Sequence, residues 1–203
     1  MSGAPTIVSH HAARIGPGRL VLVVGPSGAG KDTLLNLARG ACAGNPTIVF
    51  PRRLVTREAS ASEDNIQLDD EAFERLLSEG ALSVHWGAHG HRYGLPRSVE
   101  DEVRAGHTVV ANVSRTVVAP LRQNVADVVV VAISAPPEVL AERLALRRRS
   151  SDGAIESRLA RGVDDAVAPD ITIVNVGDPA THADRLVQAI AGAPTREVEP
   201  TPR

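Results

Sequence analysis

The sequence has a single cysteine and no long apolar run. Because Cys42 stands alone, the chain cannot form a disulfide framework or a cysteine-based metal site. No apolar run approaches the roughly 20 residues that a membrane-spanning helix requires. The segment 1–18 lacks the apolar stretch of a signal peptide. We therefore expect a cytoplasmic protein that makes no membrane contact.

An excess of positive charge is also missing. The formal net charge is −2 at pH 7, whereas domains that bind nucleic acid in bulk normally carry a basic excess. We therefore expect no nucleic-acid partner. The basic residues are nearly all arginines, because Lys31 is the only lysine in the chain. Arginine is the planar, bidentate partner of phosphate, but a GC-rich genome produces the same bias, and composition leaves both explanations open.

The pattern of apolar segments indicates a single α/β domain. A chain of 203 residues is long enough to bury roughly 70% of the surface that its unfolded form exposes. Apolar strands alternate with helical segments, which is typical of a mostly parallel sheet with helices on both faces. We expect extended segments at residues 19–25, 46–58, 107–113, 127–133 and 170–176. We expect helices at residues 32–40, 68–80, 96–105, 136–149, 155–166 and 179–190, and one more from about residue 115.

The other segments have no regular pattern. Residues 1–18 are rich in Gly, Pro, Ala and Ser and are expected to form a flexible leader, and residues 192–203 a disordered tail. Residues 83–95 are rich in Gly and His and are expected to be irregular. Gly40 is expected to end the first helix. The folded domain is therefore expected to span residues 19–191.

The segment between the first expected strand and the first expected helix, GPSGAGKDT, nearly matches the phosphate-binding P-loop pattern G-x-x-x-x-G-K-[ST]. A glycine-rich turn of this kind lets backbone N–H groups converge on phosphate oxygens near the positive end of the helix. A chance match is disfavoured because strand, turn and helix are all in place. Lys31 is expected to reach the β and γ phosphates. The expected ATP-binding residues are Gly25, Pro26, Ser27, Gly28, Ala29, Gly30, Lys31, Asp32 and Thr33.

Asp32 departs from the P-loop pattern, which has a hydroxyl residue after the lysine to ligate Mg²⁺. A carboxylate that faces a polyphosphate is repelled unless a cation lies between them. Mg²⁺ prefers hard oxygen ligands and keeps several waters, so we expect Asp32 to hold Mg²⁺ directly or through water. No expected strand clearly ends in an aspartate that could be a second metal anchor, which favours this role. The alternative is a first-turn residue favoured only by the helix dipole.

Beyond the P-loop, the order of motifs resembles the guanylate-kinase superfamily over roughly residues 19–191. The matching motifs are VTRE at 55–58, HRYG at 91–94, RLALRRR at 143–149 with ESRLAR at 156–161, and IVNV at 173–176. The resemblance implies a P-loop NTPase fold with an acceptor-binding region at about 52–95 and an arginine-rich lid at about 147–161. It also implies that Asn175 approaches the adenine of ATP.

The sequence departs from that superfamily where guanine is recognised. Guanylate kinases read guanine with acidic residues, but His85 replaces a glutamate in SVHWG, and Asn112 and Ser114 replace an acidic pair in ANVSR. A tyrosine that contacts the acceptor phosphate is also absent from SEDNIQL at 62–68. The acceptor is therefore not expected to be GMP.

The remaining patterns resemble the ribose 1,5-bisphosphate phosphokinase family, small guanylate-kinase-like enzymes of phosphonate catabolism. The shared patterns are GPSG-x-GKD-[ST], R-x-x-TR and W-x-A-x-G-x-x-YG, of which aspartate after the lysine is the most diagnostic. The resemblance implies phosphorylation of ribose 1,5-bisphosphate by ATP, with Mg²⁺, to 5-phosphoribosyl 1-diphosphate. Charge also favours this acceptor. The acidic residues that recognise guanine would repel a sugar bisphosphate, whereas arginines would bind its two anionic ends.

Phosphoryl transfer requires positioning and charge neutralisation more than a base. We expect Lys31 to act on the donor. The expected acceptor residues are Arg53, Arg57, Tyr93, Asn112, Ser114, Arg115 and Arg161. The expected catalytic residues of the lid, which would close over the transferring group and exclude water, are Arg147, Arg149 and Arg158. Any single arginine could instead be a solvated charge on a helix face.

Two other functions compete with this one. A guanylate kinase or another nucleoside-monophosphate kinase shares the donor site and differs in the acceptor. A non-catalytic interaction module of guanylate-kinase-like fold would show an eroded P-loop, but Gly25, Gly30 and Lys31 are intact. The expected partners are thus ATP and a small phosphorylated sugar.

Overall fold

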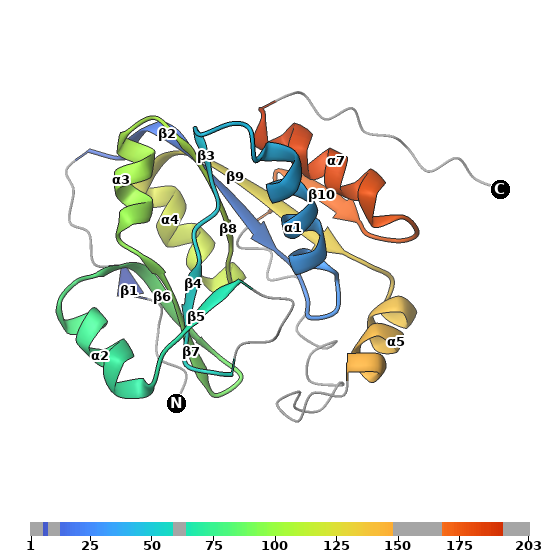
Figure 1. Cartoon of the computed structure of the whole chain (residues 1–203), viewed down its shortest axis with the longest axis horizontal. Coiled ribbons are helices and arrows are strands. Elements are labelled where there is room, and N and C mark those ends of the chain that lie inside the picture. Colours follow the sequence, from blue (N-terminus) through green and yellow to red (C-terminus); the bar gives the residue numbers. More distant parts are fainter. Residues whose placement is uncertain (1–5, 8–12, 59–63, 148–167, 193–203) are drawn as a thin grey trace.

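The computed structural model describes residues 6–7, 13–58, 64–147 and 168–192. These residues form two five-stranded sheets with helices packed around them (Figure 1). None of the helices in these ranges is long and apolar enough to cross a membrane.

The central sheet is entirely parallel. Its strands, in spatial order, are β10 (Ile171–Val174), β9 (Val125–Ser134), β2 (Ile15–Val24), β8 (Thr108–Asn112) and β3 (Ile48–Val49). Strand β2 is central and pairs with β8 on one side and β9 on the other. Its run of valine and leucine is continuous because a central parallel strand is buried on both faces. The parallel core predicted from the sequence is confirmed.

Helices cover both faces of this sheet. Helices α1 (Lys31–Cys42) and α7 (Pro179–Ile190) lie side by side on one face, and α3 (Ser98–Arg104) and α4 (Val118–Asn124) cover the other (Figure 1). Successive residues of β2 alternate between the two layers. Val21 and Val23 pack with α1 and α7, whereas Leu20 and Leu22 pack with α3 and α4. The carboxyl end of β2 leads directly into the loop before α1.

The second sheet is mixed and lies beside the central one. Its strands, in spatial order, are β1 (Thr6–Ile7), β6 (Leu82–Ala88), β7 (His91–Pro96), β4 (Arg53–Val55) and β5 (Asn65–Gln67). Strands β4 and β5 are parallel, and the other neighbours are antiparallel. Apart from β1, this sheet lies in the region at about 52–95 that was expected to bind the acceptor.

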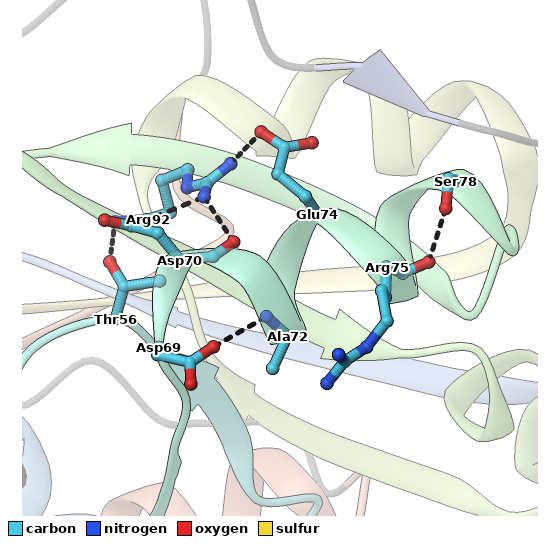
Figure 2. A network of polar contacts seen from close by, with 8 residues as sticks. All are labelled: Thr56, Asp69, Asp70, Ala72, Glu74, Arg75, Ser78 and Arg92. Carbon is cyan, nitrogen blue, oxygen red and sulfur yellow. Dashed lines mark hydrogen bonds and ion pairs between the residues drawn. The ribbon is translucent and has the colours of Figure 1, made fainter.

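Helix α2 (Asp70–Ser78) is fixed to the second sheet by a polar network (Figure 2). Asp69 caps the helix by accepting a hydrogen bond from the backbone N–H of Ala72 at 2.7 Å. Arg92 of β7 forms ion pairs with Asp70 and Glu74, and its guanidinium lies 4.8 Å from the ring centre of Phe73. The network holds the second sheet against its helix.

Two further elements follow strands of the central sheet. The 3-10 turn η1 (Arg115–Val117) follows β8, and α5 (Pro137–Arg147) follows β9. Both begin just beyond the carboxyl ends of central strands, the edge where parallel α/β sheets bind ligands.

The structure corrects three local expectations. Residues 83–95 form most of the β6–β7 hairpin, in which Trp86 pairs with Tyr93. Strand β2 begins at Ile15, inside the segment expected to be a leader. Gly40 lies within α1, which continues to Cys42. Packing of these segments on neighbouring strands and helices overrides the local signals of Gly, His and Pro.

Candidate active site

The loop between β2 and α1 has a backbone that only glycine can adopt at several positions. Gly25, Gly28 and Gly30 have φ values of 147°, 85° and 88°. A Cβ atom on Gly25 would lie 2.0 Å from the carbonyl oxygen of Ile133. The ammonium of Lys31 is 2.9 Å from the carbonyl oxygens of both Gly25 and Pro26. The loop, the lysine and the start of α1 thus fit the triphosphate of a nucleotide.

Asn175, which directly follows β10, supports the backbone of this loop. Only 2% of its surface is exposed. Its Nδ2 donates to the carbonyl oxygen of Ala29 at 2.8 Å, and a Cβ atom on Gly30 would lie 2.2 Å from that nitrogen. Arg143 of α5 donates to the carbonyl oxygens of Asn175 at 3.1 Å and Gly28 at 3.5 Å. The observed contact of Asn175 is therefore with the P-loop backbone, and its contact with adenine stays a prediction.

Replacing Asn175 by alanine should destabilise the protein. The carbonyl oxygen of Ala29 would lose its buried donor, which costs about 1–3 kcal/mol. We expect a lower urea midpoint for Asn175→Ala, and a higher KM for ATP because the loop is less constrained. Gln188→Ala, on the exposed side of α7, is the control and should unfold like the wild type. An unchanged urea midpoint for Asn175→Ala would contradict a supporting role.

Asp32 lies in the first turn of α1 and contacts residues of both sheets. Asn112, at the end of β8, donates to its Oδ1 at 3.0 Å. Arg53 of β4 forms an ion pair with the same oxygen at 3.7 Å, and donates from Nε to Oδ1 of Asn65 at 3.2 Å. Three sequence-predicted site residues, Asp32, Arg53 and Asn112, are therefore brought together.

These residues line a pocket between α1, β4, β5 and β8. The polar residues that line it are Asp32, Asn36, Arg39, Arg53, Asp64, Asn65 and Asn112. Asp64 forms ion pairs with Arg39 and Arg52, each at 2.7 Å. Arg39 was missed by the sequence reasoning, although it follows Asp32 by seven residues and so lies on the same side of α1.

A second group of predicted residues lies on the β6–β7 hairpin and just after β4. Arg57 donates from Nε to the hydroxyl oxygen of Tyr93 at 3.2 Å. Tyr93 stacks on Trp86 with ring centres 5.7 Å apart. Burial lowers the pKa of the neighbouring His85, opposed by the charge of Glu74 and assisted by that of Arg92. His85 is therefore a neutral imidazole at neutral pH.

The remaining predicted residues are only partly placed. The hydroxyl oxygen of Ser114 accepts from the backbone N–H of Thr116 at 3.4 Å and caps η1. None of the ion pairs among the described residues involves Arg115, which lies partly exposed at the start of η1. Arg147 is the last residue of α5. Arg149, Arg158 and Arg161 lie outside the described residues.

The class of the protein follows from the fold and the loop. A parallel α/β sheet with a P-loop, joined to a second, mixed sheet, is the architecture of a guanylate-kinase-type phosphotransferase. The crystal structure of guanylate kinase from Anaplasma phagocytophilum resembles it with a TM-score of 0.62 and 26% identity, covering 88% of this chain and 87% of that one. No family model matches the chain.

Curated relatives define the family more closely. The ribose 1,5-bisphosphate phosphokinase PhnN of Bradyrhizobium diazoefficiens is 57% identical over 198 residues, which cover 97% of this chain and all of that one. The protein of the same name from Rhodopseudomonas palustris is 62% identical over 87% of this chain and 90% of its own. The chain belongs to the ribose 1,5-bisphosphate phosphokinase family.

Proposed function

We propose that this protein transfers the γ-phosphoryl group of ATP to ribose 1,5-bisphosphate, giving 5-phosphoribosyl 1-diphosphate and ADP, in phosphonate catabolism. The observation that carries the proposal is the pocket beside the P-loop, where Arg53 and Asn112 meet Asp32. The arginine and amide groups of this pocket suit a phosphorylated sugar, which offers anionic groups and hydroxyls but no base. The pocket's two carboxylates, Asp32 and Asp64, are each paired with arginine. The names of the full-length relatives support the same acceptor.

The reaction needs little covalent chemistry from the protein. An oxygen of the 1-phosphate attacks the γ-phosphorus, the bond from that phosphorus to the β-γ bridging oxygen breaks, and ADP leaves. The attacking oxygen is already anionic, so no general base is required. The P-loop and Lys31 would bind the β and γ phosphates, and Mg²⁺ bound with ATP would neutralise their charge.

The acceptor would be bound by the residues around the second sheet. Arg57 and Arg115 would clamp its phosphates, and Tyr93 would fix Arg57 through its hydroxyl. Asn112 and Ser114 would leave room for the sugar, and they would not add the negative charge of the acidic residues that recognise guanine. The lid residues proposed to close over the transferring group are Arg147, Arg149 and Arg158, and Arg161 is proposed to contact the acceptor.

A guanylate kinase activity is the second candidate, favoured by the similarity to the Anaplasma phagocytophilum enzyme. The test is an assay of the purified protein with ATP, Mg²⁺ and either ribose 1,5-bisphosphate or GMP. Phosphorus NMR would show the coupled doublets of a new diphosphate if the sugar is phosphorylated. Turnover with GMP and none with the sugar would reject the proposal. A non-catalytic module would turn over neither.

Asp32 is proposed to hold Mg²⁺, directly or through water. Both observed contacts of its carboxylate use Oδ1, and within the described part of the chain none uses Oδ2. One hard oxygen is thus available next to Lys31, which fits a Mg²⁺ ion that otherwise keeps water and phosphate ligands.

Replacing Asp32 by asparagine should therefore produce a metal-specific defect. We expect Asp32→Asn to raise the Mg²⁺ concentration that gives half-maximal activity, because a neutral amide holds the ion less strongly. ATP affinity in the absence of metal should hold or improve, since a repelling charge is gone. Asp64→Asn, which removes a carboxylate from the same pocket, is the control. An unchanged Mg²⁺ dependence would leave Asp32 as a helix-start residue.

A further inference from the structure

A continuous series of side-chain contacts links the acceptor pocket to the P-loop. It runs from Asn65 of β5 through Arg53 of β4 to Asp32 of α1, and ends at Asn112 of β8. Asn65 and Asn112 are buried, with 7% and 8% of their surfaces exposed. Asp32 directly follows Lys31, whereas Arg53 belongs to the second sheet. One carboxylate therefore stands between the donor and acceptor sides.

The ion pair of Asp32 and Arg53 is partly buried, and the distance between its charged groups is long. The side chains are 22% and 14% exposed, so solvent screens their charges less than those of a surface pair. The separation of 3.7 Å is longer than a charge-assisted hydrogen bond. Arg53 is oriented by its hydrogen bond to Asn65, while Asp32 offsets its charge. An anionic acceptor would have to compete with Asp32 for this guanidinium.

We propose that Asp32 couples the two substrate sites by exchanging Arg53 for the cation of the donor nucleotide. Without nucleotide, Asp32 holds Arg53 and weakens its attraction for the acceptor. When the cation neutralises Asp32, Arg53 is released toward the acceptor phosphate. Asp32 is thus a positioning residue for Arg53, a role that a serine or threonine hydroxyl could not fill because it carries no charge. The inference rests on the proposed function.

The coupling can be measured without turnover. Ribose 1,5-bisphosphate is titrated calorimetrically into the protein, alone and with saturating Mg²⁺ and a non-hydrolysable ATP analogue. We expect the donor complex to tighten acceptor binding by roughly tenfold, within the range usual for coupled sites. Linkage requires the acceptor to tighten binding of the analogue by the same factor.

Variants identify the residues that carry the coupling. Asp32→Asn should bind the acceptor more tightly than wild type in the absence of nucleotide, and should show little further gain when the donor complex is added. In an Arg53→Gln background, Asp32→Asn should have no such effect. Asp64→Asn, whose carboxylate pairs with Arg39 and Arg52 instead, should keep the coupling. Binding of the analogue without metal checks that each variant retains its donor loop.

Three results would overturn the inference while leaving the proposed function in place. The first is acceptor affinity in the wild type that does not change with the donor complex. The second is an Asp32→Asn effect that persists in the Arg53→Gln background, which would mean that the carboxylate acts only through its general charge. The third is equal loss of coupling in Asp64→Asn. If the wild type bound GMP but no ribose 1,5-bisphosphate in either state, the proposed function itself would fail.

Discussion

Lys31→Ala should nearly abolish turnover while leaving the fold intact. The ammonium lies against the carbonyl oxygens of Gly25 and Pro26, at the centre of the loop that would hold the β and γ phosphates. Losing such a contact to the transferring phosphates should cost roughly 3 kcal/mol or more in the barrier, about 10²-fold in rate. The measurement is kcat by a coupled ADP assay, with circular dichroism to confirm folding.

The composition of the chain gives an independent check on this lysine. Because Lys31 is the only lysine, an amine-directed acetylating reagent has one side-chain target, and acetylation removes its charge. ATP should protect Lys31 from the reagent. Activity should fall in proportion to the loss of unmodified Lys31, which mass spectrometry measures. Near-normal kcat in a folded Lys31→Ala variant would refute the donor-site assignment.

The strand, loop and helix around Lys31 were predictable because their signals are local. Strand β2 is a continuous apolar run, and the glycines and lysine that follow it are adjacent in the chain. Helix α7 (Pro179–Ile190) matches its predicted range, since Asp178 caps it and Pro179 occupies its first turn. Short-range rules of this kind fix where an element begins and what its loop can bind.

The contacts around the residues proposed to bind the acceptor were less predictable because they join distant segments. Asp32 and Asn112 are 80 positions apart, and nothing in either local pattern indicates that they share a hydrogen bond. The β6–β7 hairpin was not predicted, because its glycines and histidines conceal the strand pattern, and its register, in which Trp86 pairs with Tyr93, is seen only in the structure. Arg143 supports the P-loop from α5, although its local sequence indicates only a basic helix end. In these places tertiary packing, not propensity, decides the structure.

Acceptor choice should show the second large effect. The wild type is expected to prefer ribose 1,5-bisphosphate over GMP by orders of magnitude in kcat/KM, because His85, Asn112 and Ser114 occupy the positions where the resemblance to guanylate kinases implies acidic residues that pair with guanine. Asn112 already donates to Asp32, and burial lowers the pKa of His85 so that the imidazole is neutral. A polar base edge left unpaired in such a site is penalised far more than a missing apolar contact.

The arginines assigned to the acceptor should separate the two substrates kinetically. Arg57→Ala and Arg115→Ala should raise KM for ribose 1,5-bisphosphate and leave KM for ATP nearly unchanged, because each removes a phosphate clamp from one site only. Arg75→Ala, which removes the same charge from an exposed position on α2, is the matched control and should change neither constant. A parallel rise in KM for ATP would place these arginines on the donor. If GMP gave the higher kcat/KM in the wild type, the enzyme would instead be a divergent guanylate kinase.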